Sequence, residues 1–318
     1  MSESGASKDG MDIPEPLRLR LHATSANLGP GFDASAVALD FYLEIEARPA
    51  EEFSIAATGR DAERCSRLKD NLILEIYKDL LVRHGKPIIP LAIRMENGIP
   101  LGMGCGSSAA GRLAAIALAV HFGNLGWSSE QILEEACALE GHPDNAAACW
   151  LGGFVTATTE GPKVHVVRVD PPAQWRVILA LPLQPLATSK ARAVLPDCYS
   201  RAEVVTNIQS VALLGLAFAQ ARGDLLRLAM RDCIHQPYRS SICPLLPPLI
   251  ALSGRHGILG AALSGAGPAV LLIVKDEADI EAACSGIRSA LDGFLEPELK
   301  ICSFENQGTT KTLGAVAF

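Results

Sequence analysis

The segment Pro100-Leu101-Gly102-Met103-Gly104-Cys105-Gly106-Ser107-Ser108-Ala109-Ala110 is the most informative part of this chain. Its three alternating glycines let the backbone approach a ligand closely. They lead directly into a helix start, where unpaired N–H groups and the helix dipole favour an anion. The two serines add hydroxyls that can donate to phosphate or bind a metal. A glycine-rich turn with serine caps is the alternative that spacing alone leaves open.

The segment matches neither common nucleotide-binding motif. No lysine follows the last glycine, which excludes a Walker P-loop, and the glycine spacing and downstream acid of a dinucleotide fingerprint are missing. A triphosphate site without the P-loop lysine needs another cation, usually magnesium, and therefore an acid nearby. Glu140 is one candidate acid, as are Glu134, Glu135 and Asp144, although each could also be a solvated acid on a helix face.

A second glycine-rich segment, Ser264-Gly265-Ala266-Gly267-Pro268, lies between two apolar runs near the C-terminus. It can be a tight turn between strands, and its two glycines also permit close approach to phosphates from another part of the fold. Both interpretations stay open at this point.

The pattern of apolar residues predicts an α+β protein with a sheet on one face and helices on the other. Ser128 and Gln131, and likewise Ser200 and Glu203, have the spacing of capping boxes that begin helices. The predicted helices are 71–84, 107–122, 129–140, 201–221, one beginning at Asp224, one before the strand 260–263, and 278–291. The predicted strands begin at Leu17 and include 39–47, 91–95, 164–169, 176–181, 260–263, 269–274 and 299–304. Residues 27–33 are predicted to be a loop.

Composition bounds the function classes. The 318 residues carry 28 bases and 35 acids, a formal charge of −7, and a net negative protein is unsuited to coating nucleic acid or an anionic membrane surface. The longest apolar runs are shorter than the roughly 18 residues of a membrane span. Nine scattered cysteines with no Cys-x-x-Cys pair argue against a metal site or disulfide frame. We expect a cytoplasmic protein with a flexible tail over residues 1–15.

Taken together, three segments resemble the signature motifs of the GHMP small-molecule kinases, in family order: Asn27-Leu28-Gly29-Pro30-Gly31-Phe32-Asp33, residues 100–110, and residues 259–268. The match is closest to the homoserine kinases, because residues 140–145, 188–196 and 232–239 also resemble segments of that family. The resemblance implies a first domain like ribosomal protein S5 domain 2 and a ferredoxin-like second domain. We expect them to span residues 16–170 and 171–318, with the border near Asp170-Pro171-Pro172, in a homodimer.

The resemblance also implies an activity, the ATP-dependent phosphorylation of the L-homoserine hydroxyl to O-phospho-L-homoserine in threonine biosynthesis, and assigns roles by position. Ser108 and Glu140 would bind Mg²⁺. ATP would be held by Pro100, Leu101, Gly102, Met103, Gly104, Cys105, Gly106, Ser107, Ser108, Ala109, Ala110, Gly265 and Gly267. The homoserine site would comprise Asn27, Asp33, His142, Asn145, Thr188, Arg192 and Arg239, with Asn27 and Asn145 closest to the chemistry.

The chemistry of homoserine agrees with that assignment. Its zwitterion needs an anion for the ammonium, guanidinium for the carboxylate and a neutral polar group beside the alcohol. Asp33, the two arginines and Asn145 supply this set. Cys105 stands where the family usually has leucine, which changes packing but removes no phosphate donor. Asp144 could be proposed as a general base, but the resemblance favours direct attack, and no base is assigned.

Two alternatives remain. One is another GHMP kinase of a small alcohol, such as a threonine, mevalonate or pantoate kinase, since pocket shape decides between similar substrates. The other is a catalytically inactive member that binds a nucleotide or a partner protein for regulation. The presence of Ser108, Glu140 and the glycines argues against the second.

Overall fold

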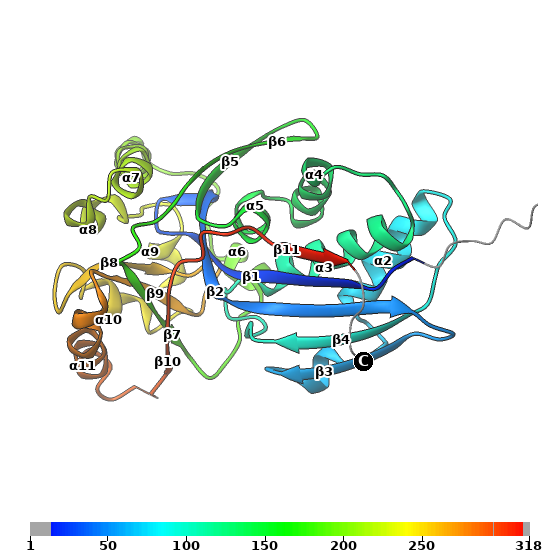
Figure 1. Cartoon of the computed structure of the whole chain (residues 1–318). Coiled ribbons are helices and arrows are strands. Elements are labelled where there is room, and N and C mark those ends of the chain that lie inside the picture. The colour runs from blue at the N-terminus through cyan, green and yellow to red at the C-terminus, as the bar shows by residue number, and fades with distance from the viewer. Residues whose placement is uncertain (1–13, 295, 314–318) are drawn as a thin grey trace, which may run out of the picture.

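The computed structural model describes residues 14–294 and 296–313, and their strands form two sheets (Figure 1). The first sheet has the order β11-β1-β2-β4-β3, with β5 and β6 joined to it through β2. Its strands are β1 (Leu17–Asn27), β2 (Gly31–Pro49), β3 (Ser54–Gly59), β4 (Leu91–Asn97), β5 (Phe154–Glu160), β6 (Lys163–Val169) and β11 (Thr310–Leu313). The second sheet, in the order β10-β7-β9-β8, comprises β7 (Arg176–Leu181), β8 (Ile258–Leu263), β9 (Val270–Val274) and β10 (Glu298–Cys302).

Helices accompany both sheets. Those between β3 and β5 are α1 (Ala62–Cys65), α2 (Leu72–Arg83), α3 (Ser107–Phe122), α4 (Ser129–Glu140) and α5 (Asp144–Leu151). The later helices are α6 (Thr188–Ala193), α7 (Arg201–Ala219), α8 (Leu226–Ala229), α9 (Gln236–Arg239), α10 (Leu246–Ile250) and α11 (Ile280–Ala290), with the 3₁₀ turns η1 (Gly223–Leu225) and η2 (Glu277–Asp279). The expected α+β arrangement is confirmed.

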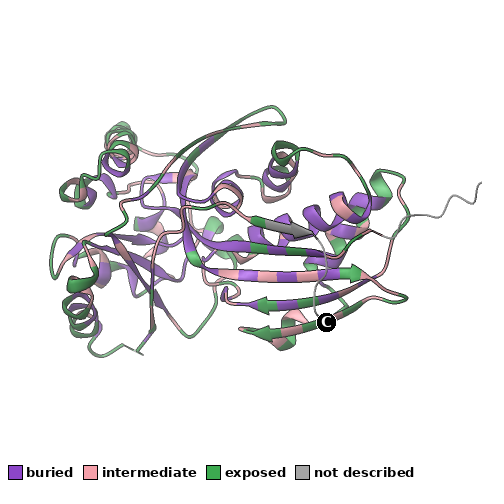
Figure 2. Cartoon of the chain, in the orientation of Figure 1, coloured by how far each residue is buried: buried purple, intermediate pink, exposed green. Residues whose placement is uncertain are grey.

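The core joins the two sheets. Along β7, Val177 and Leu179 belong to the large cluster that also includes β1, β2 and α3, whereas Ile178 and Ala180 belong to a second cluster with α10 and α11. The second sheet is therefore buried on both faces. Helix α3 is buried along most of its length, as the purple ribbon of Figure 2 shows, so its N-terminus is held firmly at the end of the core.

Several predicted helix boundaries are confirmed. Both capping boxes are present, at Ser128 with Gln131 and at Ser200 with Glu203. Helix α3 spans 107–122 as predicted, and α4 ends at Glu140, after which Gly141 adopts the left-handed conformation that glycine tolerates best. The cap therefore fixes where the chain turns immediately after Glu140.

Other predictions differ from the structure. The expected loop at 27–33 is a turn of only three residues, 28–30, because β2 begins at Gly31 and continues beyond its bulges to Pro49. Helix α7 ends at Ala219 rather than 221, and Asp224 lies in η1, one turn before α8. The strands β3, β5 and β11 and the short helices α1, α5, α6 and α9 were not predicted. Residues 1–13 of the predicted tail lie outside the described residues.

Among the described residues, the 19-residue helix α7 is long and apolar enough, by length and composition, to cross a membrane. From the sequence, every apolar run was predicted to be too short for this. Only 22% of its apolar window is buried inside the structure. A soluble protein's helix can pass the same test, so this is weak evidence for a membrane span. All nine cysteines are free thiols in the structure.

A buried histidine fastens the β1–β2 turn to the second half of the chain. The Nε2 atom of His235 lies 2.8 Å from the carbonyl oxygen of Gly29, and its Nδ1 atom lies 3.2 Å from Nη1 of Arg239. Since a guanidinium can only donate, Nδ1 accepts and Nε2–H donates, which defines a neutral ring. Burial lowers the pKa of His235 to about 4, with the nearby Arg239 charge acting in the same direction and Asp232 opposing it.

This geometry predicts acid sensitivity. An unfolded histidine takes up its proton near pH 6.5, whereas folded His235 resists protonation to about pH 4. The free energy of unfolding should therefore fall as the pH is lowered from about 6.5 towards 4. In urea unfolding between pH 7.5 and 4.5, His235→Gln should lower the stability at neutral pH but reduce this slope. The exposed His165→Gln is the control, and equal slopes in wild type and His235→Gln would contradict the prediction.

Candidate functional site

The first glycine-rich segment is a loop that only glycine could form here. Gly102, Gly104 and Gly106 have φ values of 71°, 78° and 72°. A Cβ at Gly104 would collide with the carbonyl oxygen of Ser264, and one at Gly106 with the hydroxyl of Thr24. The alternating glycines thus satisfy both a backbone conformation and a close approach.

Hydrogen bonds tie this loop to β1 and to the second glycine-rich segment. The hydroxyl of Ser264 donates to the carbonyl of Gly104 at 2.7 Å, and the N–H of Thr24 donates to Cys105 at 3.1 Å. The amide of Asn27 donates to the carbonyl of Gly265 at 2.8 Å. The three segments singled out in the sequence therefore meet at one place.

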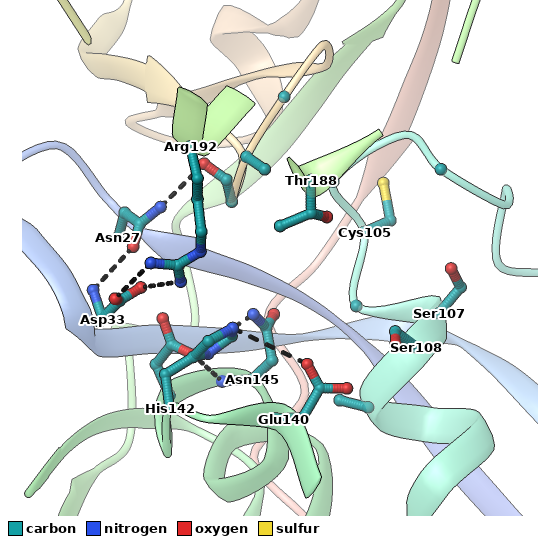
Figure 3. Close-up of a pocket in the computed structure, with 18 of the residues that line it drawn as sticks. Asn27, Asp33, Cys105, Ser107, Ser108, Glu140, His142, Asn145, Thr188 and Arg192 are labelled. Carbon is teal, nitrogen blue, oxygen red and sulfur yellow. Dashed lines mark hydrogen bonds and ion pairs between the residues drawn. The ribbon is translucent and has the colours of Figure 1, made fainter. Parts of the chain in front are cut away.

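A cavity of about 310 Å³ opens where they meet (Figure 3). Helix α3 begins there, and the residue before it, Gly106, has no side chain to cap its N–H groups. Most of the predicted site residues form the cavity wall: Asn27, Asp33, Gly102, Gly104, Cys105, Gly106, Ser107, Ser108, Ala109, Glu140, His142, Asn145, Thr188, Arg192, Arg239, Gly265 and Gly267. Pro100, Leu101, Met103 and Ala110 are not part of this wall.

A second cavity of about 310 Å³ lies on the other side of the glycine loop and is more apolar. Leu101 lines it, and Gly102, Ser107 and Ser108 line both cavities. The other lining residues include Leu43, Asn71, Leu72, Ile73, Met95 and Ile99. An elongated ligand with an apolar end and a charged end can therefore extend past the helix start from one cavity into the other.

Ser108 and Glu140 come together around a third side chain, Arg112. Arg112 Nη1 donates to Glu140 Oε1 at 2.5 Å and also contacts the hydroxyl of Ser108. The positively charged nitrogen of Arg112 thus contacts the two side chains that the sequence analysis proposed as metal ligands. Both offer oxygen atoms beside the glycine loop. Such a site fits Mg²⁺, which binds proteins through oxygen ligands and usually through only one or two carboxylates.

Asp33 and Arg192 form a bidentate ion pair at the opposite end of the cavity. The two guanidinium nitrogens donate to the two carboxylate oxygens at 2.8 and 2.9 Å. Asp33 has a φ of 54°, and its N–H donates to Asn27 Oδ1 at 3.0 Å. Asn27 therefore connects the Asp33 backbone to the second glycine-rich segment.

Arg239 is only 1% exposed, yet none of its hydrogen-bond partners is a carboxylate. It donates to the carbonyls of Ala191 and Gly265 and to His235. The ring of Phe32 lies 5.3 Å from this guanidinium and 5.4 Å from that of Arg192. Burial, and next the charge of Arg192, lower the pKa of Arg239. The buried Arg239 guanidinium can therefore bind an anionic group of a ligand.

His142, Asp144 and Asn145 form a compact hydrogen-bonded group at the start of α5. His142 Nδ1 lies 2.6 Å from Asp144 Oδ1, which also accepts the N–H of Asn145 at 2.6 Å. Burial alone would lower the pKa of His142, but the hydrogen bond to Asp144 and neighbouring carboxylates outweigh it, so the pKa is raised. Asn145 Oδ1 accepts from the hydroxyl of Thr24 at 2.6 Å.

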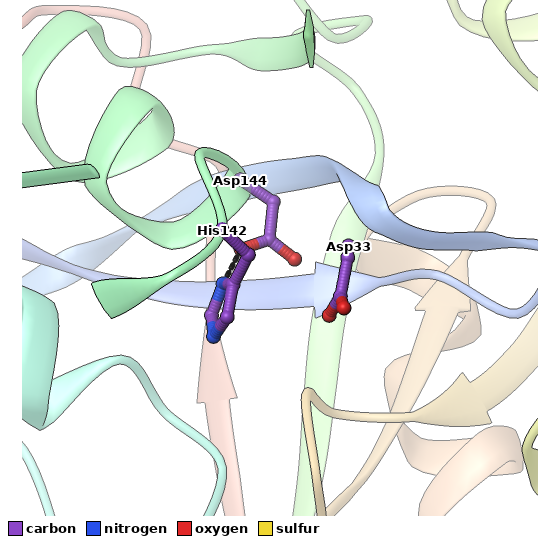
Figure 4. Close-up of side chains that lie close together, drawn as sticks. All are labelled: Asp33, His142 and Asp144. Carbon is purple, nitrogen blue, oxygen red and sulfur yellow. Dashed lines mark hydrogen bonds and ion pairs between the residues drawn. The ribbon is translucent and has the colours of Figure 1, made fainter. Parts of the chain in front are cut away.

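Asp33, His142 and Asp144 place one ligand atom each within 4.8 Å of one another (Figure 4). The distances between these ligand atoms would allow all three to bind one metal ion. However, Asp33 already binds Arg192 through both oxygens, and Asp144 binds His142. Magnesium also prefers oxygen over imidazole ligands. The pair Ser108 and Glu140 therefore suits Mg²⁺ better than this cluster does.

The structure adds wall residues that the predicted site lacked. They are Phe32, Arg112, Leu186 and Ala266. Asp144, one of the candidate acids from the sequence, also lines the wall. The signal for Arg112 was present in the sequence, because a residue four positions after Ser108 lies on the same helix face. Phe32 and Leu186 gave no such signal, since an apolar residue in a loop is usually read as packing.

Cys105, the departure from the family pattern, is buried beneath the loop at 1% exposure. Burial raises the pKa of its thiol to about 12, so it is a neutral packing group. Met103 packs against the same core.

Comparison with known proteins identifies the family of the chain. The model of the GHMP kinases N terminal domain matches residues 71–153, and that of the GHMP kinases C terminal domain matches residues 216–293. The chain is 40% identical to a homoserine kinase of Solibacter usitatus, covering 91% of this chain and 95% of the relative. It is 36% identical to a homoserine kinase of Synechocystis, covering 91% and 96%.

Solved structures show the same fold. A homoserine kinase from Cytophaga hutchinsonii superposes with a TM-score of 0.79 at 23% identity, covering 97% of this chain and all of the other. The mevalonate kinase of L. major superposes with a TM-score of 0.67 at 14% identity, covering 93% and 97%. From its sequence relatives and its two matched domains, the chain belongs to the homoserine kinase family of GHMP kinases.

Proposed function

We propose that the chain transfers the γ-phosphoryl group of ATP to the hydroxyl of L-homoserine, giving O-phospho-L-homoserine and ADP in threonine biosynthesis. One observation carries this proposal. A single cavity joins the open N-terminus of α3 to a set of charged groups that matches an amino-acid zwitterion. The similarity to homoserine kinases supports the same substrate.

The amino-acid end of the substrate would bind at the Asp33–Arg192 pair. Its carboxylate would contact Arg239, the buried guanidinium without a carboxylate partner, and Arg192. Its ammonium would contact Asp33. The existing ion pair resembles the zwitterion in charge, so substrate binding exchanges one set of ionic hydrogen bonds for another. His142, Asn145 and Thr188 would line the remainder of this site.

The nucleotide would extend along the glycine loop. Its phosphates would bind the N–H groups at the start of α3, and its base would occupy the apolar second cavity beside Leu72 and Ile99. The loops carrying Gly102–Gly106 and Gly265–Gly267 would approach the phosphates from two sides. Mg²⁺ held by Ser108 and Glu140 would neutralise charge on the transferring group.

The surroundings of the acceptor hydroxyl favour direct attack without a dedicated base. His142 Nδ1 is already engaged by Asp144 Oδ1 at 2.6 Å, so this nitrogen is not available to the acceptor hydroxyl. Asp144 is 1% exposed, and its Oδ1 already accepts from His142 and Asn145. Asn27 and Asn145 cannot take a proton, so they would orient the hydroxyl. Positioning and charge stabilisation would then supply the rate enhancement.

We further propose the domain division at residues 170 and 171 and a cytoplasmic homodimer. The two sheets and the two matched family models support the division, except that β11 returns to pair with β1. An apolar stripe along α7 supports self-association. Val205, Ile208 and Leu216 are 46%, 59% and 58% exposed, and Ala212 lies between them. Covering such a stripe with a second copy removes apolar area from water.

The substrate proposal predicts Mg²⁺-dependent ATP consumption that is highest with L-homoserine. The test compares homoserine, threonine, mevalonate and pantoate, each with and without magnesium. Higher kcat/KM with mevalonate or pantoate would assign the chain to another small-molecule kinase. Nucleotide binding without turnover on any of the four would favour the inactive, regulatory alternative.

Removing the carboxylate-binding guanidinium should weaken substrate binding. A charge-assisted hydrogen bond contributes about 1.5–3 kcal/mol, so Arg192→Ala should raise the homoserine KM by about 10- to 150-fold. The KM for ATP should change much less. Arg239→Lys, which keeps the charge but loses the planar fork, should act in the same direction. Arg222→Ala, at an exposed pair with Asp224, is the control. An unchanged homoserine KM in both site variants would refute this arrangement.

The dimer proposal predicts that charge on the α7 stripe separates the subunits. Val205→Asp combined with Ile208→Asp should convert the dimer to a monomer in light scattering, with retained helical circular dichroism. Ser285→Asp, on an exposed face of α11, should have no effect. A wild-type monomer, or wild-type protein that sediments with membranes after cell lysis, would contradict the proposal.

A further inference from the structure

Arg112 lies in α3, a helix whose other residues are nearly all apolar or small. It is the only Asp, Glu, Lys or Arg in α3, and most of this helix is buried in the core. Its side chain is 22% exposed and lines the first cavity. Since it lies one turn after Ser108, its guanidinium reaches the start of the helix, where the phosphates are proposed to bind.

The guanidinium is held by the two groups that are proposed to bind the metal. It pairs with Glu140, whose side chain is only 9% exposed, and it contacts the hydroxyl of Ser108. A metal ion and Arg112 therefore compete for the same oxygens. Any metal that binds Glu140 releases the guanidinium beside the glycine loop.

A released guanidinium in this cavity has one suitable partner. Asp33 is bound by Arg192, and Asp144 is bound by His142, so neither carboxylate is free to receive Arg112. Phosphate oxygens bound at the start of α3 would face the same cavity wall as Arg112 and would match its planar donors.

We propose that Arg112 is a phosphate-binding residue that alternates between two partners. Without metal, it neutralises Glu140 and keeps Ser108 and Glu140 together. When the metal–nucleotide complex binds, the metal takes these oxygens and Arg112 moves to the phosphates. The inference rests on the proposed nucleotide site. It adds which partner the Arg112 guanidinium has before and after the nucleotide binds.

The test measures binding without turnover, by calorimetry with ADP in the presence of EDTA or of Mg²⁺. Arg112→Met keeps the apolar stem but removes the charge. In EDTA the wild-type guanidinium is held by Glu140, so this change alone should alter ADP binding little. In the Glu140→Gln background, which frees Arg112, it should weaken ADP binding in EDTA by about 10-fold or more. Arg112→Lys should retain part of that affinity. Mn²⁺ titration of the nucleotide-free protein should show tighter metal binding in Arg112→Met, because the competing cation is gone.

A second variant separates a phosphate contact from a structural role. Glu140→Gln should tighten ADP binding in EDTA, because it frees Arg112, and this gain should shrink when Arg112→Met is also present. The double-mutant cycle therefore reports coupling through Arg112. Arg83→Met is the matched control. Arg83 pairs with Glu135, which lies on α4 like Glu140, but this pair lies outside the cavity.

The outcomes distinguish the two proposals. If wild-type protein binds Mg·ADP but Arg112→Met leaves ADP binding in EDTA unchanged even in the Glu140→Gln background, the Arg112 inference is wrong and the kinase proposal stands. A gain from Glu140→Gln that is the same in both backgrounds would also overturn it. If wild type binds no nucleotide under either condition, the proposed nucleotide site itself fails.

Discussion

The close contact between the first glycine loop and the loop that follows β8 is the constraint on which the site depends. Ser264 donates to Gly104, while Gly265 both donates to Ala26 and accepts from Asn27. These bonds join residues more than 150 positions apart in the sequence. Because a Cβ at Gly104 would separate the two loops, the glycine determines how the second half of the chain meets the first. This contact shapes the first cavity, because residues of both loops line it together with the start of α3.

Charge within the site is balanced locally and differs from the charge of the whole chain. The chain has a formal charge of −7. In the cavity, Arg112 pairs with Glu140, Arg192 with Asp33, and His142 with Asp144, which leaves Arg239 as the cation without a carboxylate partner. An acidic surface and a site for anions are compatible because each cation is buried or paired where it is used. Phe32 supports two of these guanidiniums through its ring face.

Local signals predicted the elements well and the pairings of side chains poorly. Caps at Ser128 and Ser200 act over three residues, so they could be read directly, and α3 and α4 have the predicted bounds. The positions of Asp33 and Arg192 were selected by family resemblance, but their mutual ion pair depends on tertiary approach over 159 residues. Arg112 was missed, although it lies four residues after Ser108 on one helix face, because its contact with Glu140 joins two different helices. The short strand β11 was missed because its partner is near the other end of the sequence.

The pairing of β11 with β1 has a consequence for the order of folding. Thr310–Leu313 complete the edge of the first sheet, beside residues Leu17–Arg20. During synthesis, the N-terminal strand leaves the ribosome long before its neighbour exists, and one side of it stays without hydrogen bonds until nearly all described residues have been made. The proximity of these strands also makes a circularly permuted chain, joined through a short linker between residues 14 and 313, topologically compatible with the same sheet order.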